Sequence, residues 1–168
     1  SIPNNNVLAV RQDKHNRLWV LCKYNKIGYI DLDELHYHPV RVDMPETDLA
    51  RQEGDIHIDL EGHVMLFFRY GLPVAYDETA HVFTRAAVPF EMPKGWTAQS
   101  ILADSVTHTY YLGSDSGLVK YDPARHILSY RGHNSDNDPI ITRYGHMKPA
   151  KPMILDKSGR FWLYSWPS

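Results

Sequence analysis

The chain has 168 residues, and 18 Lys and Arg against 20 Asp and Glu give it a formal net charge of −2. This balance provides no electrostatic footprint for nucleic acid, and no apolar run approaches the length of a membrane span, so we expect neither kind of contact by this segment. Cys22 is the only cysteine, which excludes an internal disulfide and leaves the redox compartment undecided.

A short phrase recurs along the chain. It reads Asp-Lys-His-Asn-Arg-Leu-Trp-Val from Asp13 and Asp-Lys-Ser-Gly-Arg-Phe-Trp-Leu from Asp156, with weaker copies from Asp59 and Asp104. Each copy begins roughly 50 residues after the previous one, a period that is typical of repeat architectures. The chain is therefore interpreted as a series of similar units.

Each repeat continues beyond this phrase. A second aspartate follows in the first three copies, at Asp31, Asp77 and Asp122. Between the turn residues lie short apolar or alternating runs, four to a repeat, which is the pattern of an antiparallel meander. We expect an all-β fold of β-propeller blades in one domain, 1–168, with blades at about 6–43, 55–86 and 98–131 and a half blade at about 150–166.

The four repeated aspartates are interpreted as turn-forming residues and not as catalytic carboxylates. An Asp at the first position of a turn accepts backbone N–H bonds, and a Gly or Asn three residues later tolerates positive φ. Asn16, Gly62 and Gly159 satisfy this rule. Thr107 breaks it, so we expect the third turn to be built differently.

One large side chain follows each turn at a fixed place. It is Trp19 in the first repeat, Met65 in the second, Tyr110 or, with a one-residue gap, Tyr111 in the third, and Trp162 in the last. A flat side chain at this position packs twisted sheets face to face. We therefore assign these residues to packing between blades and not to a sugar platform.

Two segments resemble the repeat of the two-component regulator propeller family. They are Asn6-Val7-Leu8-Ala9-Val10-Arg11-Gln12-Asp13-Lys14-His15-Asn16-Arg17-Leu18-Trp19-Val20 and Gly117-Leu118-Val119-Lys120-Tyr121-Asp122-Pro123. The resemblance implies an extracytoplasmic, periplasmic sensor region of a Bacteroidetes hybrid two-component system whose parent protein is anchored in the inner membrane. Met65, Thr107 and Lys26 depart from the family pattern.

The number of blades is smaller than a closed ring requires. Propellers have roughly four to eight blades, whereas the chain supplies about three and a half. We therefore expect the chain to be a fragment whose partners are the remaining blades, or further copies of the chain, which cover apolar faces and strand edges.

One end of the blades is the expected place for a ligand. The loop between the second and third strands and the segment that leads to the next blade emerge together, opposite the Asp13 and Asp31 turns. Loops that vary in length on a rigid scaffold carry function. The candidate binding residues there are aromatic or cationic, which suits an oligosaccharide: Tyr24, Arg69, Tyr70, Trp96, Arg143 and Tyr144.

Neither a cofactor nor a metal is expected. His36 and His38 lie two residues apart, but His36, His81 and His126 recur after the turn aspartates as ordinary turn residues. No cysteine or carboxylate cluster in the sequence completes a set with metal-ligand spacing.

Three functions remain open at this point. The first is a non-catalytic ligand-sensing fragment of a hybrid histidine kinase receptor that responds to a carbohydrate. The second is a propeller scaffold for protein interaction without small-molecule sensing. The third, a propeller lyase or glycosidase, requires paired carboxylates or a His or Tyr base on the central face, and no catalytic residue is identified in the sequence.

Overall fold

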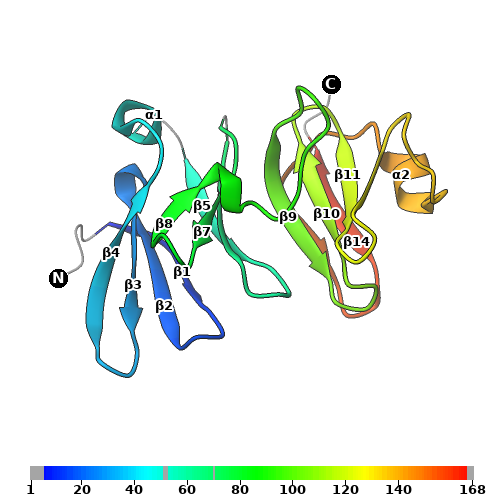
Figure 1. Ribbon diagram of the computed structural model, residues 1–168. Coiled ribbons are helices and arrows are strands. Elements are labelled where there is room, and N and C mark those ends of the chain that lie inside the picture. The colour runs from blue at the N-terminus through cyan, green and yellow to red at the C-terminus, as the bar shows by residue number, and fades with distance from the viewer. Residues whose placement is uncertain (1–5, 51–52, 70, 166–168) are drawn as a thin grey trace. The chain divides into compact units, whose positions relative to one another are not determined.

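The computed structural model describes residues 6–50, 53–69 and 71–165. The chain forms two compact units, Ser1–Pro89 and Phe90–Ser168, each of which is described by itself (Figure 1). The regular secondary structure of the described residues is mostly strand, with only short helices in the connections, so the predicted all-β blade fold is confirmed.

Unit 1 contains two four-stranded antiparallel meanders. The first has β1 (Val7–Gln12), β2 (Arg17–Cys22), β3 (Lys26–Asp31) and β4 (His36–Val42), and the second has β5 (Gly54–Ile58), β6 (Val64–Phe68), β7 (Val74–Asp77) and β8 (Val82–Thr84). The two meanders meet through a short parallel pairing of β4 with β8, at Arg41–Val82 and Val42–Phe83. β4 and β8 are the fourth strands of their meanders, and equivalent strands of neighbouring propeller blades point in the same direction, which explains why this pairing is parallel.

Unit 2 contains a third meander and a two-stranded half blade. The meander has β9 (Ala98–Asp104), β10 (Thr109–Ser114), β11 (Leu118–Asp122) and β12 (Ile127–Tyr130), and the half blade has β13 (Pro149–Leu155) and β14 (Phe161–Ser165). Short helices lie in the connections: η1 (Lys23–Asn25), α1 (Glu46–Ala50), η2 (Arg85–Ala87) and α2 (Pro139–Tyr144).

Helix α2 has a local signal that the strand-based interpretation passed over. Asp138 caps it by accepting the N–H groups of Ile140 and Ile141, and Pro139 occupies the first turn. An Asp–Pro pair at this place is a common helix start. The Asp138 carboxylate also binds Lys120 of β11 at 2.7 Å, which fastens the helix to the meander.

The core of unit 1 lies between its two meanders. Trp19 on β2 is fully buried, and its ring meets Tyr76 edge-on at 4.8 Å and Phe83 at 5.5 Å between centroids. Because side chains alternate across a strand, Trp19 and Leu21 face the second meander while Leu18 and Val20 face away from it. Trp19 therefore packs one blade on the next.

A single carboxylate joins the turn before β2 to this core. Asp13 Oδ1 accepts the N–H groups of His15 at 2.9 Å and Arg17 at 3.0 Å. Its Oδ2 accepts Arg17 Nε at 2.7 Å and the indole Nε1 of Trp19 at 2.8 Å. The same group thus closes the turn and fixes the orientation of the packing ring.

Arg17 extends this contact to the second meander. Its terminal nitrogens form a two-point ion pair with Glu78, at 2.8 Å and 2.5 Å. The guanidinium also lies over the rings of Trp19, Tyr29 and Tyr76 at 5.3 to 5.4 Å. One arginine therefore connects the turn of one blade to a turn of the next.

The third turn differs from the others, as predicted from Thr107. Positive φ occurs at the third residue after Asp13, Asp59 and Asp156, but in the third repeat it falls on His108, at 53°, four residues after Asp104. This is the geometry of the later turns, where Leu35, His81 and His126 take positive φ. The sequence also grouped His36 with His81 and His126, but in the first repeat Leu35 takes the positive-φ position and His36 begins β4.

The longer turn decides which aromatic residue of the third repeat packs between sheets. Tyr111 and not Tyr110 faces the half blade, where its ring lies 4.9 Å from that of Phe161. Tyr111 also belongs to a buried cluster with Leu118, Ile141 and Met153. The one-residue gap that the sequence left open is therefore required.

We expect Asp13→Ala to lower the free energy of unfolding of unit 1 by about 2–4 kcal/mol, because it removes the acceptor of two buried donors, Arg17 Nε and the Trp19 indole. Asp156→Ala is the matched control, since Asp156 binds the corresponding groups of Arg160 and Trp162 but is partly exposed. We expect this variant to lose less free energy of unfolding. Urea unfolding of both variants measures the difference. Equal losses would contradict the central role of Asp13.

We expect unit 1 to lose stability as the pH falls below about 4. Burial raises the pKa of Asp13, but hydrogen bonds from the Trp19 indole, Arg17 and the turn backbone outweigh it, so that the pKa lies below its usual value. The hydrogen bond from Arg17 lowers the pKa of Glu78. Carboxyl groups with a pKa lowered by folding stabilise the fold above their unfolded pKa, about 4, and lose this effect as the pH falls through the folded value.

Thermal melting across this pH range tests the expectation. Glu78→Gln is expected to reduce the slope of melting temperature against pH, whereas Glu34→Gln, at an exposed position, is expected to leave it unchanged. If Glu78→Gln and Glu34→Gln had the same slope, the ion pair of Glu78 would make no contribution to the pH dependence of stability.

Candidate functional site

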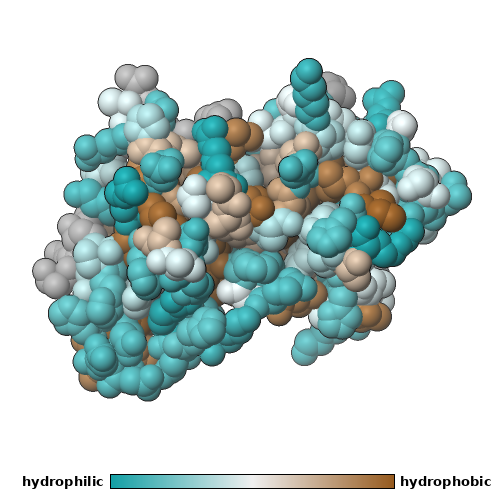
Figure 2. Space-filling model, viewed as in Figure 1, coloured by the Kyte–Doolittle hydropathy of each residue, from teal (hydrophilic) through white to brown (hydrophobic). Residues whose placement is uncertain are grey.

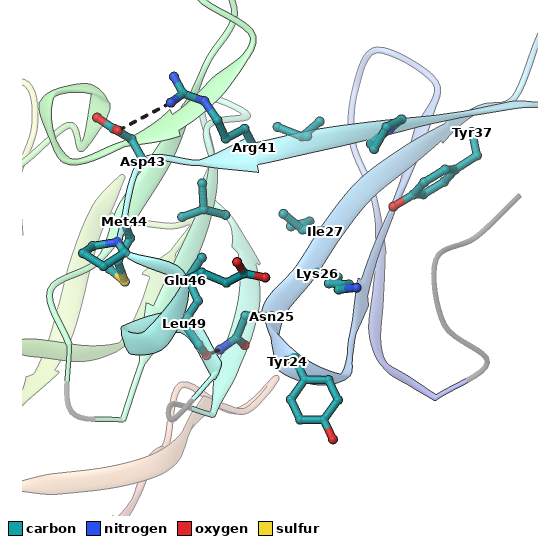
Figure 3. Close-up of a pocket in the computed structure, with 14 residues that line it drawn as sticks. Tyr24, Asn25, Lys26, Ile27, Tyr37, Arg41, Asp43, Met44, Glu46 and Leu49 are labelled. Atoms are coloured by element: carbon teal, nitrogen blue, oxygen red, sulfur yellow. Dashed lines mark hydrogen bonds and ion pairs between the residues drawn. The ribbon is translucent and has the colours of Figure 1, made fainter.

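A groove of about 860 Å³ lies in unit 1 between the end of β4, the turn between β2 and β3, and helix α1 (Figure 3). Its floor is apolar and its rim is polar. The apolar lining residues are Ile27, Pro39, Val40, Val42, Met44, Pro45 and Leu49, and the polar ones are Tyr24, Asn25, Lys26, Tyr37, Arg41, Asp43 and Glu46. In Figure 2, brown hydrophobic side chains show beneath α1 among teal neighbours.

The turn between β2 and β3 forms one wall of the groove. Tyr24 and Asn25 both take left-handed backbone conformations, with φ of 64° and 52°. This places the Tyr24 ring outward, 53% exposed, with the Lys23 ammonium 5.1 Å from the ring centroid. Asn25 turns inward and donates to the Leu49 carbonyl at 2.6 Å, so the turn holds α1 in place.

This contact supports the predicted arrangement of the loops. The turn between the second and third strands and the segment leading to the next blade lie together at one end of the meander, as the sequence pattern indicates. The same arrangement recurs in unit 2, where the Leu118 N–H at the start of β11 donates to Gly145 at the end of α2 at 3.3 Å.

Tyr37 forms the far end of the groove. Its hydroxyl is buried without a hydrogen-bond partner in the described structure, and burial raises its pKa to about 12. The ring lies over Gly28, where a Cβ would collide with the Tyr37 hydroxyl and the His38 carbonyl. Figure 3 shows the hydroxyl directed towards β3. Gly28 therefore keeps the space that the Tyr37 ring occupies.

The rim of the groove carries side chains of both positive and negative charge. Arg41 and Asp43 form a loose, exposed pair at 3.9 Å. Lys26 and Glu46 are also exposed, and Figure 3 shows Glu46 extending from α1 towards β3. Such a rim presents donors and acceptors to a polar ligand, while the apolar floor accepts a ring face or an alkyl group.

Three candidate binding residues were predicted in unit 1, and the structure describes two of them. Tyr24 lines the groove, whereas Arg69 does not and instead lies beside Glu53 at 3.7 Å, just after β6. Tyr70 falls outside the described residues. The other groove residues gave no signal in the sequence, because a floor assembled from β3, β4 and α1 depends on how these elements pack.

The predicted residues of unit 2 gather around the turn between β10 and β11. A Cβ on Gly117 would lie 3.3 Å from the Trp96 ring and would collide with the Gly145 carbonyl at the end of α2. On α2, the Arg143 guanidinium lies 5.3 Å from the centroid of the Tyr144 ring. Tyr144 also packs on the buried cluster of unit 2, so part of its role is structural.

One set of potential metal ligands emerges that the sequence spacing did not reveal. In the described residues, ligand atoms of Asp59, Glu61 and His63 lie within 4.8 Å of one another. Asp59 Oδ2 and His63 Nδ1 already bind each other at 2.7 Å, and Asp59 Oδ1 accepts the His63 N–H. The set is thus explained as the second-repeat version of the aspartate turn.

Within the same described residues, no helix is long and apolar enough to cross a membrane.

Comparisons with known proteins agree with this fold. Residues 1–24 match the family model described as two component regulator propeller. No curated protein matches the chain in sequence. Among solved structures, the extracellular domain of the proposed hybrid two component system BT4673 from B. thetaiotaomicron matches with a TM-score of 0.61 and 13% identity, over 94% of this chain and 19% of that chain.

A second solved structure gives the same result. The extracellular domain of the proposed hybrid two component system BT3049 from B. thetaiotaomicron matches with a TM-score of 0.58 and 14% identity, over 98% of this chain and 22% of that chain. The chain thus spans about one fifth of these domains, and identities this low establish the fold alone. Residues 1–24 therefore match the two component regulator propeller, the family whose repeat the sequence resembles, and the chain shares its blade fold with these extracellular domains.

Proposed function

We propose that the chain is a non-catalytic, ligand-sensing part of a two-component receptor and that it responds to a carbohydrate outside the cytoplasm. The observation that carries the proposal is the match of residues 1–24 to the two component regulator propeller. The solved structures of similar fold are extracellular domains of proteins described as two component systems. The remaining blades and an anchor in the inner membrane belong to the same proposal for the parent protein.

The groove of unit 1 provides the chemistry for such a ligand. The exposed Tyr24 ring offers an apolar face to the C–H side of a sugar. Lys26 and Glu46 on the rim offer a donor and an acceptor to ring hydroxyls, and the apolar floor excludes water from the contact. A pyranose with a carboxylate, such as a uronic acid, gains a further interaction with Lys26.

The other predicted residues are proposed as secondary contacts. In unit 1, Arg69 follows β6 at the loop end of its blade, where it is available to a sugar that extends beyond the groove. In unit 2, Trp96, Arg143 and Tyr144 lie at the loop end of their own blade and are proposed as a separate sugar contact. Tyr70 belongs to the same loop end by its position in the sequence.

Calorimetric titration with neutral and uronic-acid oligosaccharides tests the proposal. We expect Tyr24→Ala to weaken binding about fivefold, because one aromatic contact contributes about 1 kcal/mol, and Lys26→Ala to weaken selectively the binding of acidic sugars. Lys157→Ala, which removes an exposed lysine of unit 2, is the matched control and is expected to have no effect.

Two outcomes would contradict the proposal. Binding that survives both groove substitutions would place the ligand elsewhere, and the absence of binding across the whole panel would reject a carbohydrate ligand. Shortening of the oligosaccharide during the titration would instead support the lyase or glycosidase alternative.

A further inference from the structure

The outer face of β14 reproduces the face of β2 on which the second meander of unit 1 packs. Asp156 Oδ1 accepts the N–H groups of Ser158 and Arg160, both at 2.9 Å. Its Oδ2 accepts Arg160 Nε at 2.7 Å and the indole Nε1 of Trp162 at 3.0 Å. These are the same four donors, in the same order, that bind Asp13.

The two faces differ in what covers them. The Arg17 side chain is 11% exposed, and that of Arg160 is 68% exposed. Trp19 is fully buried, whereas Trp162 is 55% exposed. The packing of Trp162 between blades therefore stays a prediction. Ile154, paired with Trp162 across the half blade, is also half exposed. The face of β14 therefore has the same arrangement as that of β2, but the described residues leave it exposed.

Arg160 also lacks the partner that Arg17 has. Arg17 uses its Nε for Asp13 and its terminal nitrogens for Glu78. Arg160 uses its Nε for Asp156, and in the described part of the chain its terminal nitrogens meet no acceptor. A guanidinium fixed through Nε presents these nitrogens as a fork that fits one carboxylate.

We infer that the face formed by Ile154, Arg160 and Trp162 is a docking surface for a propeller blade that carries a carboxylate directly after its second turn aspartate. The second meander shows the features expected of this partner. There, Glu78 directly follows Asp77, and the rings of Tyr76 and Phe83 cover Trp19. The carboxylate completes the Arg160 fork, and the rings cover Trp162.

A second copy of this chain does not supply such a partner. The positions of its other blades that correspond to Glu78 are Leu32, after Asp31, and Pro123, after Asp122. Glu78 itself is engaged by Arg17. Of the three blades, none therefore offers a free carboxylate at the required place, and the partner is a blade of different sequence.

The chain nevertheless allows the missing group to be introduced. In the first meander, Ile30, Leu32 and Tyr37 stand where Tyr76, Glu78 and Phe83 stand in the second. Leu32 is partly exposed, and its backbone N–H donates to Asn16 at 3.1 Å, a bond that a new side chain leaves intact. Leu32→Glu therefore creates the proposed partner on another copy of the chain.

The experiment measures self-association of the full chain by sedimentation equilibrium. We expect Leu32→Glu to associate head to tail at least about tenfold more tightly than the matched control Leu32→Gln, since close charge pairs at interfaces contribute about 1.5 kcal/mol or more. Adding Arg160→Glu is expected to return the association to the level of the control. The swapped pair, Leu32→Arg with Arg160→Glu, is expected to restore it.

Two results would overturn the inference. One is equal association of Leu32→Glu and Leu32→Gln, and the other is association of Leu32→Glu that Arg160→Glu leaves unchanged. Circular dichroism checks that each variant is folded, and Leu32→Asp, with the shorter carboxylate, replaces Leu32→Glu if the latter is unfolded and is judged by the same criteria.

Discussion

In the first meander, the bond between a turn carboxylate and an indole nitrogen holds together the turn, the packing ring and the contact with the next blade. Asp13 closes the turn before β2 with one oxygen and orients Trp19 and Arg17 with the other. A buried carboxylate is stable only when its hydrogen-bonding capacity is satisfied, so the turn, the ring and the guanidinium form together. The arginine that results is already positioned to reach the next blade.

The other repeats show how much of this arrangement can vary. In the second repeat, Asp59 binds His63 in place of an arginine. In the third, Asp104 accepts the Thr107 hydroxyl, and the turn becomes one residue longer. Only the backbone-binding role of the aspartate is common to all, because turn closure is local, whereas the link to the neighbouring blade depends on the residues that blade supplies.

The groove and the aspartate turn lie at opposite ends of β2. Arg17 begins the strand beside the Asp13 carboxylate, and Cys22 ends it at the turn that carries Tyr24. This separation allows the loop end to vary in sequence while the turn end keeps the sheets in register. The proposed ligand contacts and the proposed blade contact therefore use different sets of residues.

The sequence by itself determined the repeats, the turn aspartates and the position of most strands, because these depend on hydrogen bonds and alternation within a few residues. It also indicated that loops of one kind gather at one end. Only the tertiary structure decided that Arg17 pairs with Glu78, that Tyr111 and not Tyr110 packs between sheets, and that a groove lies beside α1. It also showed that Trp162 is exposed while Trp19 is buried. These features depend on how separate sheets pack, and packing between residues far apart in the chain leaves no local pattern from which it can be predicted.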